Sequence, residues 1–262
     1  MATGDWHYRA MTTPPLPVKD TAQWCFMGDV HGKIRAVMAT CEHAAGAGIA
    51  VLVSVGDFGF FPGRARGDRF LAEVEEALER YGLYLILVDG NHDDHSALRS
   101  LALDEAGMGV IGPRARYAPR GLTWVMGGVG FMAVGGAFSI DRWARAEGVG
   151  WWREEVLGFE DTNRCLDAGR CDVIVSHDCP LGVGRVFYSG RIVPESEANR
   201  ATLQAIVESA RPRVLVHGHY HQRYDELLEL SSGDLVEVVG LDKDGSGEDL
   251  WWDLSSDLVI GS

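Results

Sequence analysis

The amino-acid sequence predicts an α/β sandwich organised around one main domain. Short β-rich apolar runs recur along the chain, and segments with helical periodicity lie between them, an alternation typical of α/β proteins. The chain has 262 residues, of which 46% are hydrophobic, so it can bury a large core. These observations argue against a disordered chain.

Five apolar runs are expected to form strands, at residues 24–27, 49–55, 83–88, 173–175 and 214–216. Apolar residues between positions 70 and 81 follow the spacing of one helix face, which predicts a helix between the second and third strands. A second helix is predicted for residues 195–210, and Pro212 ends it.

Two hairpins are expected outside these runs. Residues 121–140 contain no charged residue over 20 positions, a length that would also suit a membrane span. Six of the 20 are glycine, however, and this favours two short buried strands, at 122–126 and 131–134, around Gly127-Gly128. The chain is therefore expected to be soluble, with a closing hairpin at 228–239 around Ser232-Gly233.

The expected organisation is a single domain over residues 21–241 with an appendage at each end. Residues 1–20 contain three prolines and no signal-peptide pattern, so they are expected to form an extended arm. Residues 242–262 are expected to form an acidic, Trp-containing tail that packs on or near the domain. No internal repeat or long linker suggests a second domain.

Charge and cysteine content limit which binding partners and which cellular compartment are expected for the chain. There are 24 Lys and Arg against 38 Asp and Glu, and the net charge of −14 disfavours binding of long nucleic acids, although a compact anion is still acceptable. The five cysteines are an odd number without CxxC spacing, so neither a disulfide framework nor a zinc knuckle is predicted. A cytoplasmic location without membrane attachment is the natural expectation.

Polar clusters follow each of the five predicted strands, at residues 28–32, 56–57, 90–93, 176–178 and 218–221. Loops at the same end of neighbouring strands converge, so these clusters are expected to share one site. Their Asp, His and Asn side chains suit borderline or harder divalent ions such as Mn, Fe, Zn, Ni or Co. Asp29 and His31 are expected to point the same way through the period-2 geometry of a strand end, and His219 and His221 to repeat that arrangement.

In this order and spacing the clusters resemble the DxH, GD, GNH[D/E], H and GHxH motifs of the calcineurin-like metallophosphoesterases. Residues 135–142, followed by Gly150-Trp151-Trp152, resemble a stretch of the small bacterial and phage members. The resemblance runs from Asp29 to His221 and implies a four-layer α/β/β/α sandwich with two mixed β-sheets. It also implies two metal ions bridged by Asp57. One ion would be completed by Asp29, His31 and His221, and the other by Asn91, His177 and His219.

The implied activity is hydrolysis of phosphomonoesters or phosphodiesters, with a nucleotide or another small phosphoester as substrate. Two divalent ions, with manganese favoured over Fe, Zn, Ni or Co, would activate a bridging hydroxide for in-line attack on phosphorus. By the same resemblance His92 would be the catalytic histidine, and Asp93 is placed in sequence to orient its imidazole.

Three alternatives stay open at this point. A nuclease or phosphatase acting on nucleic-acid ends would need no basic groove. A phosphoprotein phosphatase is less favoured, because Phe58 follows Asp57 where that branch has a DRG signature, and because Asp93 stands in place of its Glu. A metal-binding interaction scaffold would explain the acidic tail, but here every ligand position is filled. Neither the physiological substrate nor the oligomeric state follows from the sequence.

Arginines and tryptophans near the motifs are candidates for substrate binding. Arg142, the preferred one, Arg64 and Arg185 lie on loops where a guanidinium could bind phosphate oxygens, with ordinary surface arginines as the alternative. Trp151 and Trp152 are candidates for stacking on a nucleobase, with packing inside the protein as the alternative.

Overall fold

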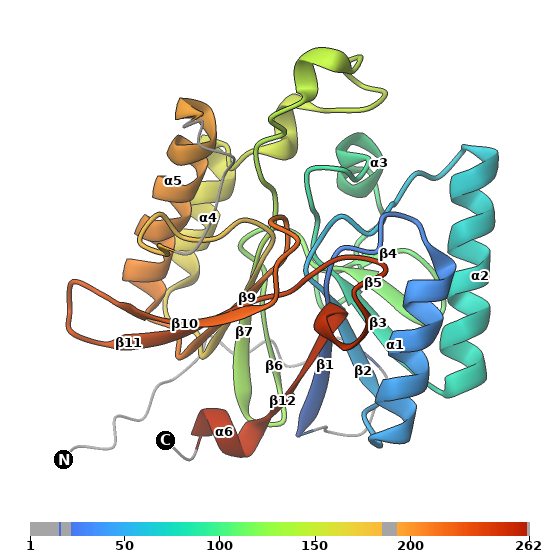
Figure 1. Cartoon of the computed structure of the whole chain (residues 1–262), viewed down its shortest axis with the longest axis horizontal. Coiled ribbons are helices and arrows are strands. Elements are labelled where there is room, and N and C mark those ends of the chain that lie inside the picture. The colour runs from blue at the N-terminus through green and yellow to red at the C-terminus, as the bar shows by residue number, and fades with distance from the viewer. Residues whose placement is uncertain (1–15, 17–21, 185–192, 261–262) are drawn as a thin grey trace.

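Two six-stranded sheets pack face to face, and helices cover their outer faces, as the computed structural model shows (Figure 1). The structure describes residue 16, residues 22–184 and residues 193–260, so nearly all of the predicted arm at residues 1–20 lies outside the described residues. The layers are helix, sheet, sheet and helix, and each sheet mixes parallel and antiparallel pairs. The predicted four-layer α/β/β/α sandwich is therefore confirmed.

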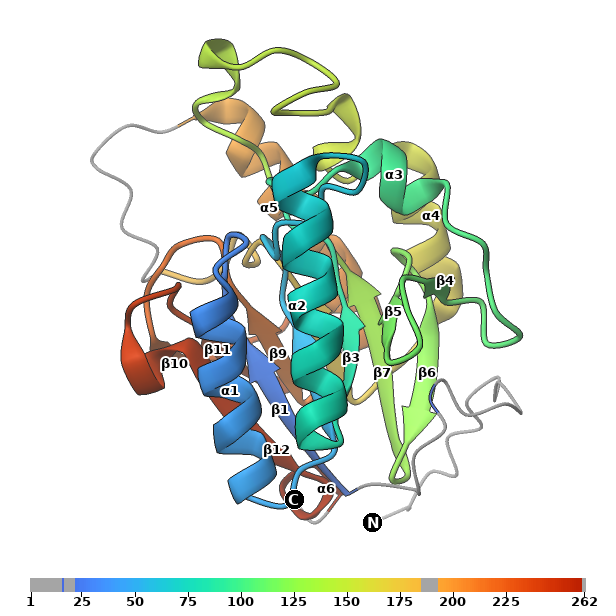
Figure 2. The same cartoon turned by 90° about the vertical axis from the view of Figure 1, so that its right-hand side faces the viewer.

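The first sheet has the order β12-β1-β2-β3-β5-β4, with three parallel pairings in its centre and an antiparallel strand at each edge. Its strands are β1 (Gln23–Met27), β2 (Val51–Ser54), β3 (Tyr84–Leu87), β4 (Gly109–Val110), β5 (Ala115–Tyr117) and β12 (Trp251–Ser255). Helices α1 (Ile34–Gly46) and α2 (Ala65–Tyr81) lie along its outer face (Figure 2). Short α3 (His95–Arg99) follows β3.

The second sheet has the order β10-β11-β9-β8-β7-β6 and repeats this pattern of parallel centre and antiparallel edges. Its strands are β6 (Thr123–Met126), β7 (Val129–Val134), β8 (Val173–Ser176), β9 (Val214–His217), β10 (Tyr224–Glu229) and β11 (Leu235–Gly240). Helices α4 (Phe159–Ala168) and α5 (Pro194–Ala210) cover it. Both predicted hairpins are present, and no helix among the described residues has the length and apolar character to cross a bilayer.

The core forms three layers because the central strands are buried on both faces. On β1, Trp24 and Phe26 face the second sheet, whereas Cys25 and Met27 face the helices of the first sheet. Between the sheets the rings of Trp24 and Phe131 meet edge to face at 4.9 Å between centroids. Burial on both faces explains why these strands read as continuous apolar runs instead of alternating patterns.

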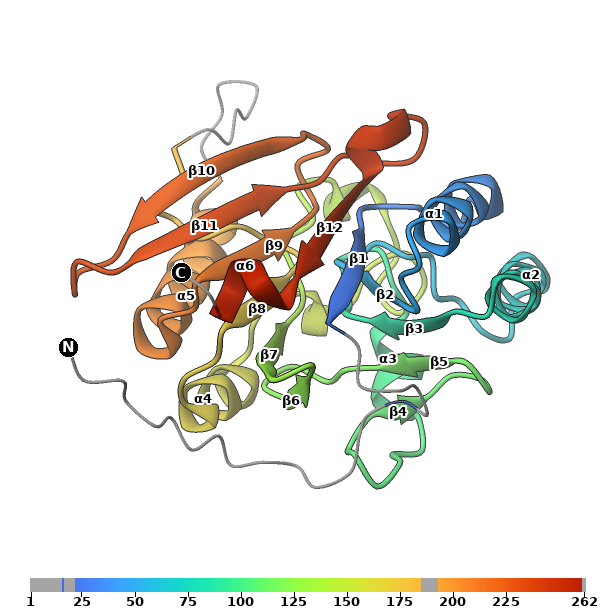
Figure 3. The ribbon, with the colours of Figure 1, turned by 90° about the horizontal axis from the view of Figure 1, so that it is seen from below.

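The acidic segment at residues 242–262 includes part of the first sheet. Residues 251–255 form β12, which pairs antiparallel with β1 along its whole length, and α6 (Ser256–Ile260) follows (Figure 3). Before it, Asp29 bridges to Lys243, and the amide of Gly28 donates to the carbonyl of Leu250 at 2.8 Å. The segment therefore lines the end of β1 from which the first polar cluster begins.

A buried ion-pair network joins the two halves of the sandwich below the polar clusters. Arg120, on the connection from β5 to β6, donates to Asp89 through Nη2 at 2.6 Å and through Nε at 3.0 Å, and to Asp161 of α4 at 3.1 Å. Tyr117 donates to the other oxygen of Asp89 at 3.1 Å. Arg120 and Asp89 are 2% and 0% exposed, so each charge depends on the other, and the pairing lowers the pKa of Asp89 despite its burial.

Replacing Arg120 by Met is expected to lower the free energy of unfolding by about 3–5 kcal/mol, because Asp89 is left as an uncompensated buried charge. Urea unfolding followed by circular dichroism measures this change. Arg99→Met is the control, since Arg99 donates to the same Asp161 at 2.8 Å but its side chain is 40% exposed. The control should cost about 1 kcal/mol or less, and equal losses would contradict this assignment.

His95 is expected to make stability fall with decreasing pH. Burial lowers the pKa of His95 from 6.5 to about 4, although the Asp89 carboxylate acts in the opposite direction. Between these pH values the unfolded chain binds a proton at His95 and the folded chain does not. The free energy of unfolding should therefore fall by up to about 1.4 kcal/mol per pH unit as the pH drops through this window.

The non-titrating His95→Gln variant lacks this contribution. The stability advantage of wild type over the variant should therefore shrink between about pH 7 and about pH 4.5, as measured by urea unfolding at each pH. A difference that stays constant over that range would show that His95 does not titrate as the structure indicates.

Candidate metal centre

The five polar clusters meet at one end of the sandwich, in the loops that follow β1, β2, β3, β8 and β9. Four of their non-glycine residues have a positive φ, namely His31 at 47°, Asp57 at 46°, His219 at 69° and His221 at 53°. Such conformations cost about 1–3 kcal/mol each and concentrate at functional sites. The chain thus accepts strain here to turn these side chains toward one point.

The expected strand geometry of Asp29 and His31 is wrong, although the two side chains do converge. Strand β1 ends at Met27, and His31 turns inward through its left-handed backbone instead of through strand alternation. The same correction applies to His219 and His221, because β9 ends at His217.

Two buried carboxylates form the centre of the site. Asp29 and Asp57 are 0% and 1% exposed. His221 Nε2 lies 3.2 Å from an Asp29 oxygen, and His177 Nε2 lies 3.3 Å from an Asp57 oxygen. His31 Nε2 lies 3.5 Å from the second Asp57 oxygen. Imidazoles therefore surround both carboxylates.

The donor atoms fall into two overlapping groups, each within 4.8 Å: Asp29 with His31 and His221, and Asp29 with Asp57 and His177. Asn91 adjoins the second group, because its side-chain oxygen lies 3.0 Å from His177 Nε2. The ring of His219 lies 5.1 Å from that of His177. All seven predicted ligand residues thus lie together. The group around His31 is the set that the resemblance implies, whereas the group around His177 also contains Asp29, which the resemblance assigns to the other ion.

The electrostatics of the cluster favour a bound cation. Burial opposes protonation of the imidazoles, but Asp57 and Asp29 raise the pKa of His31 to about 9 and that of His177 to about 10. Conversely, burial and the neighbouring His177 lower the pKa of His219 to about 3. The carboxylates therefore attract positive charge while one imidazole stays neutral, and carboxylate, amide and imidazole donors suit divalent ions.

Residues outside the motifs hold the ligands in place. His177 Nδ1 lies 2.8 Å from the carbonyl oxygen of Val55, which fixes its ring with Nε2 facing Asp57. Asn91 donates to the Ser139 hydroxyl at 2.9 Å, and Ser139 in turn donates to the buried Glu155 at 2.7 Å. His31 Nδ1 lies 3.2 Å from Asp244. Sequence reasoning missed Ser139, Glu155 and Asp244, because no spacing links them to the motifs.

Glycine is required where the strand ends pass the carboxylates. A Cβ at Gly90 would lie 2.1 Å from the Asp57 amide nitrogen, and a Cβ at Gly218 would lie 2.0 Å from an Asp29 oxygen. The glycines of the third and fifth clusters therefore bring the loops close to the carboxylates.

Asp93 does not orient His92, which corrects the sequence expectation. Its buried carboxylate accepts backbone N–H bonds from Gly59 at 2.8 Å, from Phe60 at 2.9 Å and from Gly90 at 2.9 Å. Asp93 therefore ties the loop after β2 to the loop after β3. Spacing alone could not distinguish a partner of His92 from an acceptor of backbone donors.

His92 instead lies beside Arg145, which the sequence analysis did not select. Arg145 Nη1 is 2.7 Å from His92 Nδ1, and the guanidinium also pairs with Asp141 and donates to the carbonyl of Gly150 at 3.1 Å. The backbone amide of His92 donates to Asp57 at 2.7 Å, and this hydrogen bond holds His92 next to the buried carboxylates. Burial, followed by the charge of Arg145, lowers the pKa of His92 against the pull of Asp57.

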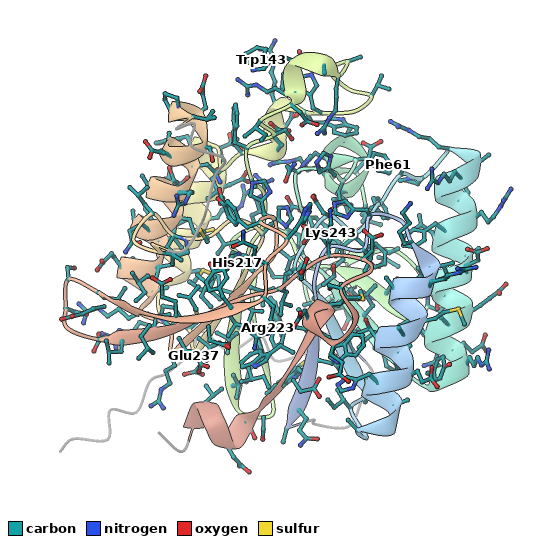
Figure 4. All side chains as sticks on the ribbon, viewed as in Figure 1. Phe61, Trp143, His217, Arg223, Glu237 and Lys243 are labelled. Carbon is teal, nitrogen blue, oxygen red and sulfur yellow. The ribbon has the colours of Figure 1, made fainter. Side chains whose placement is uncertain are left out.

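Arg142, the preferred substrate residue, packs among aromatic rings. Its guanidinium carbon lies 4.2 Å from the ring centre of Phe138, 4.6 Å from that of Trp143 and 5.4 Å from that of Trp151. Trp143 is 77% exposed at the tip of this protruding segment (Figure 4). Arg142 and Trp151 therefore stabilise the segment above the site, and Arg145 is the arginine that reaches His92.

Trp152 cannot stack on a ligand in this structure, because it is 2% exposed and packs beside Phe61 and His95. Packing, the alternative reading for this residue, is what the structure shows. Arg185 lies outside the described residues. Arg64 donates to the carbonyl of Val149 at 2.8 Å and lies over the ring of Phe61.

A cavity of about 350 Å³ opens beside the cluster. His31 and His92 form one wall, Phe61 and Phe70 contribute apolar surface, and Arg64 and Arg66 complete the lining with glycine backbone. The ring of Phe61 lies on the α2 side of the site (Figure 4). The lining is therefore largely apolar and includes two positively charged side chains.

Comparisons with known proteins found a matching family model and similar solved structures. A family model described as calcineurin-like phosphoesterase matches residues 24–223. The protein TT1561 of Thermus thermophilus is similar with a TM-score of 0.53 and 12% identity over 90% of this chain and 99% of that one. A dimetal phosphatase from Danio rerio matches with a TM-score of 0.47 and 15% identity over 86% and 88% of the two chains. YfcE, a phosphoesterase from E. coli, matches with a TM-score of 0.41 and 16% identity over 90% and 89%. No curated protein matches the chain.

Asp244→Ala is expected to weaken divalent-metal binding about 10- to 100-fold, because His31 loses the carboxylate that orients its ring. Isothermal titration of metal-stripped protein with Mn²⁺ measures the affinity. Asp249→Ala removes the same charge from an exposed position of the same segment and should bind as wild type does. Equal weakening in both variants would show that only the charge of the segment matters.

Proposed function

This chain belongs to the calcineurin-like phosphoesterase family, and from this premise we propose that it hydrolyses a small phosphoester at a dinuclear metal centre. The observation that carries the proposal is the pair of buried carboxylates, Asp29 and Asp57, with imidazoles 3.2–3.5 Å from their oxygens. A merely structural cluster would not require two adjacent buried carboxylates, one of them, Asp57, on strained backbone.

The residues of the cluster would hold two divalent ions, for which manganese is our first choice and Fe, Zn, Ni or Co the others. Asp57, approached by both His31 and His177, is the proposed bridge. Asp29, His31 and His221 would hold one ion, and Asn91, His177 and His219 the other. Such ions supply Lewis-acid chemistry, which acidifies a water and withdraws charge from a phosphoryl group.

The protein's own groups then position the substrate and handle the proton. His92, carried on Asp57 through its amide, is the proposed donor to the leaving oxygen. Arg145 is the proposed phosphate-binding group, since a guanidinium pairs well with phosphate oxygens. The Arg145 guanidinium now donates to the His92 ring, where it occupies the one acceptor nitrogen of a neutral imidazole. If Arg145 bound a phosphate instead, that nitrogen would be free to take up a proton, and His92 could then donate a proton to the leaving oxygen.

The cavity beside His31 and His92 is the proposed leaving-group pocket. The rings of Phe61 and Phe70 suit a flat apolar group, and Arg64 and Arg66 suit an additional negative charge. A nucleotide combines these two properties. A long nucleic acid is disfavoured by the net charge of −14, although a strand end remains an alternative substrate for the same pocket.

Two further alternatives are less well supported. Phosphoprotein hydrolysis finds no support in the phenylalanine-rich loop after Asp57, where Phe58 and Phe60 are buried. A non-catalytic scaffold would not need His92 beside Asp57 on the wall of the cavity. The five cysteines are free and buried, which supports the proposed cytoplasmic location.

Metal-dependent hydrolysis tests the activity itself. Metal-stripped protein is assayed with p-nitrophenyl phosphate and bis-p-nitrophenyl phosphate, with Mn²⁺, Ni²⁺, Zn²⁺, Co²⁺ or Mg²⁺ restored singly. We expect turnover that falls at least about 100-fold in Asp57→Asn and in His92→Asn. The ratio of the two substrates tells whether monoesters or diesters are preferred. Metal binding without turnover on either substrate would favour the scaffold.

A matched substrate pair tests the pocket. Adenosine 5′-monophosphate and ribose 5-phosphate have the same leaving oxygen, and only the first carries a base. Stacking in the pocket should favour the nucleotide by about 1–3 kcal/mol, or roughly 5- to 150-fold in kcat/KM. Equal values would assign the pocket to another group and leave the hydrolytic centre unaffected.

A further inference from the structure

We propose that a second, separate metal site lies on the outer face of the first sheet, where Cys25, His43 and Asp253 bind one zinc ion. Their donor atoms lie within 4.8 Å of one another, and they come from β1, α1 and β12 respectively. This site shares no residue with the cluster at the strand ends, so it does not depend on the proposed phosphoesterase function.

The sheet register brings these three residues together. Cys25 and Asp253 are directly opposite each other in the antiparallel pairing of β1 with β12, so their side chains leave the sheet on the same face. Helix α1 packs on that face, and His43 belongs to its last turn. His43 Nε2 lies 2.7 Å from one Asp253 oxygen, and the ring of Trp251 stacks on His43 at 5.0 Å. The imidazole is therefore held in a fixed orientation.

The side chains of Asp253 and Cys25 each have an atom that can still bind a cation. The second Asp253 oxygen is buried and has no hydrogen-bond partner among the described residues. Cys25 is fully buried, and its thiol makes a weak contact, at 3.8 Å, to the carbonyl oxygen of Phe26 in addition to its interaction with the Asp253 side chain. Burial raises the pKa of Cys25, and the nearby Asp253 carboxylate raises it further, so the thiol carries its proton until a cation replaces it.

The donor set and spacing suit zinc. Zinc binds thiolate, imidazole and carboxylate at about 2.0–2.3 Å, which places donor atoms of a tetrahedral site roughly 3.3–3.8 Å apart. His43 Nε2 and the Asp253 oxygen are closer than this, at 2.7 Å, and no separation in the group exceeds 4.8 Å, so small side-chain rotations are enough. Binding forms a zinc–sulfur bond and releases the thiol proton to solvent. The side chains of His43 and Asp253 are 32% and 36% exposed, which leaves a route for the ion and its fourth, solvent ligand.

A zinc ion at this site would link the edge strand β12 to β1 and α1. Among the described residues β12 pairs with β1 alone, and the segment that leads into it carries Asp244, the partner of His31. A zinc link from Asp253 to β1 and α1 would therefore hold the segment that orients a ligand of the main cluster. The role expected for this ion is structural.

Cobalt spectroscopy separates this site from the main cluster, because only this site contains a sulfur donor. Metal-stripped protein in a phosphine reductant is titrated with Co²⁺ beyond the capacity of all sites. We expect a near-ultraviolet sulfur-to-cobalt charge-transfer band that saturates at one ion per chain, and that Zn²⁺ abolishes. Asp57→Asn should retain the band, and Cys25→Ser should lose it.

Control variants make the result decisive. Cys41→Ser, on the same helix as His43, and Cys165→Ser, on α4, remove other buried thiols and should keep the band. His43→Gln and Asp253→Asn replace the half-exposed ligands, and they decide the question if Cys25→Ser does not fold. Each should weaken Co²⁺ binding at this band by more than the roughly 10- to 100-fold cost of losing an outer partner. Absence of the band in wild type, or its persistence unchanged in these ligand variants, would overturn the proposal.

Discussion

The structure depends on the burial of two carboxylates side by side. Removing Asp29 and Asp57 from water is costly unless positive charge and hydrogen-bond donors replace the solvent. The fold provides these where β1, β3, β8 and β9 end, because the loops after these strands bring imidazoles and a backbone N–H to the two carboxylates. The left-handed residues and the glycines without space for a Cβ are local consequences of this convergence.

Much of this arrangement could be predicted from the sequence, and for a definite reason. Strands buried on both faces are continuous apolar runs, and a polar cluster follows each run directly. The end of an apolar run therefore indicates where a candidate ligand lies in the sequence. Residues such as His177 and Asn91 could therefore be placed from the sequence alone. Helix α1 was not predicted, because its alanine-rich sequence has a weaker apolar face than that of α2.

The errors arose where the outcome depends on contacts between distant segments. Asp93 is adjacent to His92 in sequence, yet its carboxylate faces backbone amides from another loop. Arg145 rather than Arg142 reaches His92, because the segment between Ser139 and Glu155 folds over the site and directs its side chains by packing. Neither contact can be inferred from the spacing of residues within one segment, because each depends on how distant segments pack in the folded protein.

The pairing of β12 with β1 has a consequence for biogenesis. Asp244 and His31, which lie 3.2 Å apart, are separated by 213 positions along the chain. A ribosome therefore exposes the first ligands long before the segment that orients them and completes the sheet edge. Such non-local pairing forms late in folding. Until β12 docks, a chain would carry the carboxylate cluster with a His31 ring that lacks the support of Asp244.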